Sequence, residues 1–229
     1  MKIGIIFDLD GTLIDTTEFH AYTFKKALDC LKIKNSEELY EKFKTQIGKT
    51  LPEIIDTILP DLDEEKKKKI ENLKWKFTLE EIDKIKPIQK SIKALKVFSK
   101  YPIGLFTSST KKFSSKVLER LNIEKYFDVI VAKEDVTKGK PNPEGLTKTC
   151  EILNCDKCIY VGDSVYDELA AKRAKFIFVD VKSKNLIGSI GKAILESKIL
   201  KKNLRHQEQK LFLLLWVIIY LIQNFFWKL

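Results

Sequence analysis

The chain has 229 residues, of which 44% are hydrophobic and 32% are charged. This length can bury a sizeable core, and this composition excludes a disordered protein. Lysine and arginine number 42 against 32 acidic residues, and the net charge of +10 suits an anionic substrate. Most lysines lie in mixed runs such as Glu64 to Lys69, which are typical of solvated helix faces. Because the sequence has no basic stripe interleaved with aromatic residues, we expect no nucleic-acid partner.

The first apolar run, from Ile3 to Phe7, ends in two carboxylates, Asp8 and Asp10, followed by Gly11. Side chains of a strand alternate between its faces, so both carboxylates project to the same side. Such a pair is costly unless a cation neutralises it or one member holds a proton. The pattern predicts a catalytic or metal-binding pair, although a solvated turn after a strand has the same sequence.

Between Thr16 and about Lys86 the sequence becomes charged and helix-periodic, without a convincing strand. Pro52 stands at an expected first helical turn, and Pro60 and Pro87 mark helix ends. We therefore predict an all-helical domain over residues 16–86, inserted after the first strand. It would lie above the carboxyl ends of the strands, where α/β sheets bind ligands, and would act as a lid.

The later sequence alternates short apolar runs with helix-like stretches. Strands are predicted at 103–106, 129–132, 159–161 and 176–179, with helices at 111–121, 143–153 and 166–174. This alternation predicts an α/β fold, a doubly wound parallel sheet with a Rossmann-like core, built from residues 1–15 and 87–200.

Four cysteines and the absence of a signal peptide before the first strand favour a reducing cytoplasm. Cys155 and Cys158 form a C-x-x-C pattern with Cys150 nearby. A structural zinc site normally takes four ligands, and no fourth candidate has suitable spacing. We therefore interpret these cysteines as buried or unreactive thiols.

Residues 201–229 comprise a basic linker and an apolar segment, 211–227, predicted as a helix. At helical rise this segment spans roughly 25 Å, at the short end for crossing a bilayer. Three interpretations stay open: a membrane anchor on a cytoplasmic protein, a packed terminal helix, and a reading-frame artefact. The upstream lysines and the terminal tryptophans favour membrane association.

Polar residues follow three of the later strands and would converge on Asp8 and Asp10 in a parallel sheet. Their hydroxyl, lysine and carboxylate groups can bind an anion or a cation. Taken separately, the hydroxyl groups could be a helix cap, the lysine a surface residue and the carboxylates part of a turn. Their order after successive strands makes the whole set specific. The set consists of Thr107, Ser108, Ser109, Lys140, Asp163 and Asp167.

These motifs resemble the haloacid dehalogenase-like hydrolase superfamily, in its phosphoglycolate phosphatase and β-phosphoglucomutase-like branch with a helical cap. The matches are F-D-L-D-G-T-L, T-S-S, G-K-P-N-P and G-D-S-x-x-D, in family order over about residues 1 to 200. Lys175 departs from the pattern, since relatives usually have glycine there, and the apolar tail is foreign to the family.

The resemblance implies an enzyme that forms an aspartyl-phosphate on Asp8, with Asp10 as general acid and base. It implies one cofactor, Mg²⁺, held by Asp8, the Asp10 carbonyl and Asp163, with Asp167 on a bound water or on Lys140. Thr107 and Lys140 would bind the transferring oxygens. Substrate-binding residues would be Ser108, Ser109, His20, Gly48 and Lys49.

We therefore expect a magnesium-dependent phosphatase acting on a small phosphomonoester, phosphoglycolate-like or a sugar phosphate. A phosphomutase is the alternative, since it uses both aspartates and His20 is shared with mutase relatives. Asp10 argues against a dehalogenase, and a non-catalytic membrane-tethered protein would not need all of these residues. The expected partner is a small phosphorylated metabolite, with membrane contact through 211–227 if the anchor interpretation holds. The protein would be a monomer or a homodimer.

Overall fold

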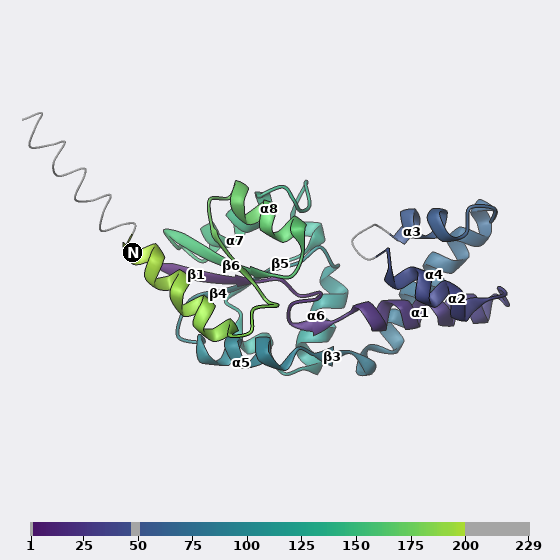
Figure 1. Cartoon of the computed structure of the whole chain (residues 1–229), viewed down its shortest axis with the longest axis horizontal. Helices are drawn as coiled ribbons and strands as arrows, with labels where there is room; N and C mark the ends of the chain where they lie inside the picture. The colour runs from purple at the N-terminus through teal and green to yellow at the C-terminus, as the bar shows by residue number, and fades with distance from the viewer. Residues whose placement is uncertain (1, 47–50, 200–229) are drawn as a thin grey trace, which may run out of the picture.

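The structure is a computed structural model that describes residues 2–46 and 51–199. A five-stranded sheet with helices on both faces forms one part, and helices α1 to α4, here called the helical unit, lie to one side of it (Figure 1). The helical unit enters the chain after the first strand, as the sequence predicts. The predicted domain limits, 16–86 for a cap and 1–15 with 87–200 for the core, stay a proposal.

All five strands of the sheet are parallel, in the order β5-β4-β1-β6-β7. Their bounds are Ile3–Phe7 for β1, Ile103–Phe106 for β4, Val129–Val131 for β5, Lys157–Gly162 for β6 and Ile177–Asp180 for β7. The predicted strands are confirmed, with ends displaced by at most two residues. Strand β1 is central, so it is buried on both faces and all five of its residues are buried.

Alternate residues of each strand face opposite helix layers. On one face, Ile5, Phe7 and Leu105 pack in a cluster with helices α5 (Gln89–Val97), α6 (Lys111–Arg120) and residues 186–199. On the other face, Ile6 and Tyr160 pack with α7 (Glu144–Ile152) and α8 (Val165–Arg173). These two clusters bury most of the apolar residues of the sheet, which fixes the register of every strand.

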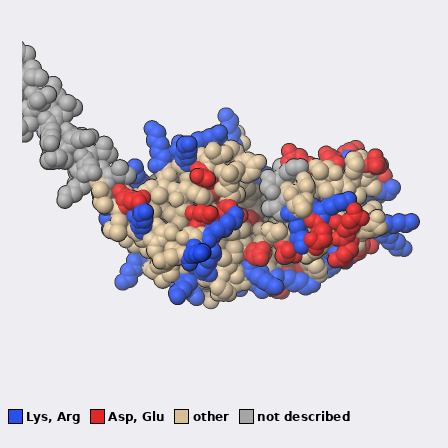
Figure 2. Space-filling view, in the orientation of Figure 1, with Lys and Arg blue, Asp and Glu red and all other residues tan. Residues whose placement is uncertain are grey.

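The helical unit has a hydrophobic core of its own. Its helices are α1 (Thr17–Cys30), α2 (Ser36–Lys44), α3 (Leu51–Ile58) and α4 (Glu64–Glu80). Phe24 and Phe43 pack with ring centroids 4.8 Å apart, within a cluster to which all four helices contribute. Figure 2 shows acidic and basic side chains interspersed over these helices, and they include ion pairs such as Lys69 with Glu65. The mixed lysine runs are thus solvated helix faces, as predicted.

Two short strands join the helical unit to the sheet part. Strands β2 (Ile14–Asp15) and β3 (Lys86–Pro87) pair antiparallel, and Ile88 donates its backbone N–H to the Leu13 carbonyl at 2.9 Å. This pair was not predicted from the sequence. Remaining short elements are the 3₁₀ turns η1 (Ile82–Lys84), η2 (Glu124–Tyr126) and η3 (Lys133–Asp135).

The predicted localisation, cytoplasmic with membrane association through the C-terminal segment, is corrected here. Within residues 2–46 and 51–199, no helix combines the length and the apolarity needed to cross a membrane. The segment 211–227, on which the membrane prediction depended, lies outside the described residues.

Candidate active site

The predicted polar residues meet at the carboxyl ends of the strands. Asp8 directly follows β1, Thr107 follows β4 and Asp163 follows β6. Asp8 and Asp163 border a cavity of about 780 Å³ that helices α1 to α4 of the helical unit also line. This is the edge at which parallel α/β sheets bind ligands, because strand ends and helix starts face the same space.

Lys140 lies between two carboxylates. Its Nζ is 2.5 Å from Asp8 Oδ1 and 2.8 Å from an oxygen of Asp167, and the lysine side chain is only 8% exposed. Burial alone would lower the pKa of Lys140, but Asp8 and Asp167 outweigh it and raise the pKa, so the ammonium stays charged. The two residues bound by Lys140 are themselves buried, and the lysine therefore fixes Asp8 through Oδ1.

Asp10 has two differently used oxygens. Oδ2 accepts a hydrogen bond from Ser109 Oγ at 2.7 Å and from Thr107 Oγ1 at 3.3 Å. Oδ1 is buried and accepts no hydrogen bond from the described residues, and His20 Nε2 lies 3.9 Å from it. Burial raises the pKa of Asp10 despite the two hydroxyl donors. The raised pKa favours the protonated form of Asp10, and Oδ1 is the oxygen free to hold the proton, as a general acid requires.

Gly11 allows the turn after β1 and the approach of Asp163. Its φ is +71°, and a Cβ built there would lie 2.4 Å from Asp163 Oδ2. No side chain fits in that space. The glycine therefore brings Asp163 to the turn that carries Asp8 and Asp10.

Asp8, Asp163 and Asp167 form a candidate metal site, with ligand oxygens all within 4.8 Å of one another. Burial raises the pKa of Asp8 and Asp163, and neighbouring carboxylates raise both further. Three carboxyl groups thus face one lysine, and their oxygens are the hard ligands that Mg²⁺ prefers. These residues fit a magnesium ion. The Asp10 side chain is not among this group, and its carbonyl stays a predicted ligand.

Lys74 and Trp75, which helix α4 presents to the cavity, were not predicted from the sequence. Lys74 of α4 is 3% exposed, and its Nζ lies 3.2 Å from His20 Nδ1 and 4.0 Å from the ring centroid of Trp75. Burial lowers the pKa of Lys74 to about 7, with Asp10 opposing the shift, and burial and Lys74 together lower the pKa of His20. Lys74 lies on one helix face with Ile70 and Thr78, and that four-residue spacing was the available signal.

The other predicted substrate residues have mixed outcomes. Ser108 is exposed and lines the cavity, whereas the Ser109 hydroxyl is occupied by Asp10. His20 lines the cavity next to Lys74. Gly48 and Lys49 lie outside the described residues.

Comparison with known proteins identifies the family. The sequence profile of haloacid dehalogenase-like hydrolases matches residues 5–181. The chain belongs to this family. A phosphoglycolate phosphatase from Aquifex aeolicus is 33% identical over 74% of this chain and 80% of its own length. A protein named "Putative pyrophosphatase PpaX" from Clostridium perfringens is 34% identical over 75% of this chain and 79% of its own.

Solved structures show the same fold. The crystal structure of a haloacid dehalogenase-superfamily hydrolase from Geobacter sulfurreducens matches with a TM-score of 0.65 and 21% identity, over 78% of this chain and 86% of that one. A structure described as "putative beta-phosphoglucomutase" from Thermotoga maritima matches with a TM-score of 0.64 and 23% identity, over 84% and 99%. The predictions of the family branch, of the α/β fold and of a phosphatase-type hydrolase are confirmed.

Proposed function

We propose that this hydrolase is a magnesium-dependent phosphatase of small phosphomonoesters that works through an aspartyl-phosphate on Asp8. The observation that carries the proposal is the different state of two adjacent carboxylates at one strand end. Lys140 Nζ contacts Asp8 Oδ1 at 2.5 Å and so favours the charged form of this carboxylate against burial, while Asp10 is buried with an unpaired Oδ1. One group is prepared to attack and the other to donate a proton.

The first step transfers the phosphoryl group to the enzyme. Asp8 Oδ2, the oxygen that Lys140 leaves available, attacks phosphorus, and the bond from phosphorus to the leaving oxygen breaks. Asp10 gives its proton to that leaving oxygen, so the product departs as an alcohol. Lys140 is placed beside the reacting oxygens to stabilise their charge.

The second step regenerates the enzyme. Asp10, now an anion, takes a proton from a water molecule, which attacks phosphorus and breaks its bond to Asp8. Inorganic phosphate leaves, and Asp8 and Asp10 return to their starting states. Asp8, Asp163 and Asp167 would hold the magnesium ion. When bound, the ion would neutralise charge on the phosphate oxygens and so favour attack at phosphorus. Ser109 and Thr107 keep Asp10 in position through both steps.

The substrate class follows from the wall of the cavity opposite Asp8. We propose that helices α1 to α4 act as a cap, and that Lys74 binds an anionic part of the leaving group. Among the described residues of the cap, Lys74 is the lysine that is both buried and in contact with the cavity. The relatives named for phosphoglycolate and pyrophosphate support this proposal, because the leaving groups of both compounds are anionic.

Phosphate release tests the proposal. Purified protein with magnesium should hydrolyse phosphomonoesters, and Asp8→Asn should reduce turnover by at least about 10³-fold because an amide is no nucleophile. Asp15→Asn is the matched control, since Asp15 is exposed on β2 and takes no part in the chemistry. Conversion of a sugar phosphate to its isomer without release of phosphate would instead indicate a mutase. Full activity of the Asp8→Asn variant would overturn the assignment.

A further inference from the structure

Three thiols gather where α7 ends and β6 begins, away from the active site. Cys150 lies in the last turn of α7, Cys155 in the connecting turn and Cys158 at the second position of β6. The Sγ atoms of Cys150 and Cys158 are 2.7 Å apart, and all four cysteines of the chain are free thiols. A disulfide bond measures about 2 Å, so the two sulfur atoms need to move by less than about 1 Å to bond.

Neighbouring backbone leaves room for these sulfur atoms. Gly4 of β1 pairs with Cys158, and a Cβ built on Gly4 would lie 2.8 Å from Cys158 Sγ and 3.1 Å from Cys155 Sγ. The Cys150 thiol also lies 3.5 Å from the Cys155 carbonyl oxygen. The packing thus holds Cys150 and Cys158 in contact rather than separating them.

The two thiols differ in character. The Cys158 S–H donates to the Cys150 sulfur, which lowers the pKa of Cys150, while the same contact and burial raise the pKa of Cys158. Of the two, Cys150 therefore loses its proton more readily, and with its sulfur 2.7 Å from Cys158 it is the better placed nucleophile. Cys150 is 6% exposed and Cys158 is 2% exposed, so only a small oxidant reaches them.

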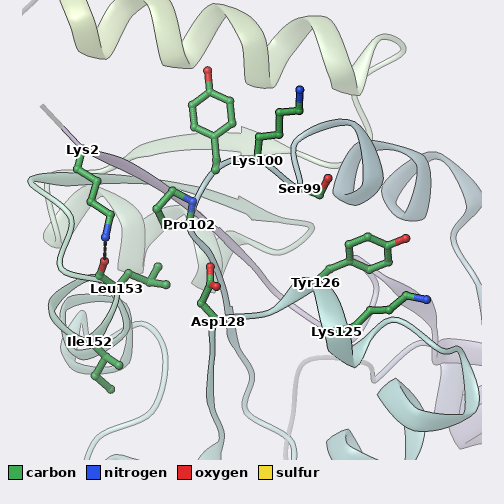
Figure 3. A pocket seen from close by; sticks show the side chains of 10 residues that line it. Lys2, Ser99, Lys100, Pro102, Lys125, Tyr126, Asp128, Ile152 and Leu153 are labelled. Carbon is green, nitrogen blue, oxygen red and sulfur yellow. Dashed lines mark hydrogen bonds between the residues drawn. The ribbon is translucent and has the colours of Figure 1, made fainter.

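A second pocket brings solvent to this end of the sheet. It has a volume of about 670 Å³ and is lined by Lys2, Ile152 and Leu153, among others (Figure 3). Lys2 Nζ donates to the Leu153 carbonyl at 2.8 Å, and the Cys155 thiol lies 3.5 Å from the same oxygen. Leu153 therefore lies between this pocket, which it lines, and the Cys155 thiol.

We propose that Cys150 and Cys158 form a reversible disulfide when the protein meets a peroxide. The Cys150 sulfur attacks one peroxide oxygen, the O–O bond breaks, and hydroxide leaves, which gives a sulfenic acid on Cys150. The Cys158 sulfur then attacks the Cys150 sulfur, the S–O bond breaks, and water leaves with the Cys158 proton. Two thiols are oxidised and one peroxide is reduced to water. A small dithiol reverses the reaction by exchange.

Peptide mapping after hydrogen peroxide treatment tests this proposal on the full chain. Cleavage after Lys157 separates Cys158 from the other two cysteines, and cleavage after Glu151 separates Cys150 from Cys155. The expected product is a dithiothreitol-sensitive link between the peptides that carry Cys150 and Cys158. The link should persist in Cys155→Ser and in Cys30→Ser, which removes the exposed thiol of the helical unit.

Stability provides a second measurement, because a buried cysteine variant can lose structure. Peroxide should raise the unfolding temperature of the wild-type protein, since a cross-link restricts the unfolded chain. Cys150→Ala should show no such rise, with a circular dichroism spectrum that matches the wild type before treatment. A link between Cys155 and Cys158 instead, or oxidation confined to Cys30, would overturn the proposal.

Discussion

Lys140 is the residue on which the electrostatics of the candidate site depend, because it contacts two buried carboxylates. Replacing it with methionine leaves Asp8 and Asp167 facing each other without a counter-charge. We expect Lys140→Met to lower the free energy of unfolding by about 3 kcal/mol at neutral pH, the typical cost of removing one partner of a buried pair. Urea denaturation measures this, and magnesium should recover part of the loss.

The same variant has a defined pH dependence. The carboxylates lose their partner, so their repulsion is relieved when one of them is protonated at acidic pH. The deficit of Lys140→Met relative to wild type should therefore shrink as the pH falls. Lys138→Met, in the same loop but exposed, is the control and should stay within about 0.5 kcal/mol of wild type. An equal loss in both variants would contradict the role of the buried contacts.

Lys74 should cause a second pH dependence of stability, because it is a buried lysine whose pKa is lowered. Its pKa falls from the usual 10.5 to about 7 because of burial, with Asp10 opposing the shift and His20 as its ring neighbour. Between these values the unfolded chain holds the proton and the folded chain does not, so stability rises with pH. The slope should approach about 1.4 kcal/mol per pH unit from this group. Below pH 7 Lys74 is charged in both the folded and the unfolded chain, so the folded protein is destabilised by the full cost of burying the ammonium.

Lys74→Met should remove that slope and stabilise the protein most at or below pH 7. Unfolding free energies between pH 6 and 10, from urea curves, measure the difference. Lys76→Met is the matched control, because Lys76 is exposed on the same helix. In activity assays, Lys74→Met should raise KM more for a substrate with an anionic leaving group than for one with a neutral leaving group. Equal changes for both substrates would contradict direct contact.

At the scale of elements, the end of α8 contains the one departure from the family pattern that lies in the described residues. Lys175 has a φ of 58°, in the left-handed region, and closes the helix with hydrogen bonds from Lys175 N to Lys172 O and from Phe176 N to Ala171 O. Glycine is the usual residue at such a helix end because it has no Cβ. We expect Lys175→Gly to raise the free energy of unfolding by up to about 1 kcal/mol.

Thermal denaturation compares this variant with a control in the same helix. Lys172→Gly lies within α8 and should lower the free energy of unfolding by about 1 kcal/mol, since glycine is unfavourable inside helices. If Lys175→Gly stabilises the protein and Lys172→Gly destabilises it, the difference is due to the backbone conformation at each position. A destabilising Lys175→Gly would mean that its side chain makes a favourable contact.

The elements also show what sequence alone can provide. Strands such as 103–106 were predictable because central parallel strands are continuous apolar runs between helical patterns. The β2–β3 pair was not, because two-residue strands have no periodicity. Asp8, Asp10 and Asp163 were predictable from position after strands. Lys74 was not predicted, because it stands among many lysines on a charged helix and only its four-residue spacing from Ile70 and Thr78 marks the buried face.

For the whole molecule, the separate hydrophobic clusters raise the question of whether its two parts unfold together. Phe24 is fully buried in the cluster of the helical unit, whereas Leu105 is fully buried under the sheet. The two parts are connected by the β2–β3 pair, by Phe19 of α1, which packs in the cluster under the sheet, and by the contact of His20 with Phe113. Regions with separate cores and few connections can open independently.

We therefore expect Phe24→Ala to cost about 3–5 kcal/mol, the usual loss for a buried phenylalanine, and to act mainly on the helical unit. Hydrogen exchange should show lost protection in α1 to α4 with protection retained in β1, β4 and β6. Leu105→Ala is the complementary variant, because a cavity under the central sheet should lower protection in the strands. Uniform loss of protection in Phe24→Ala would show that the molecule unfolds as one unit. The helical unit would then unfold only together with the sheet that carries Asp8.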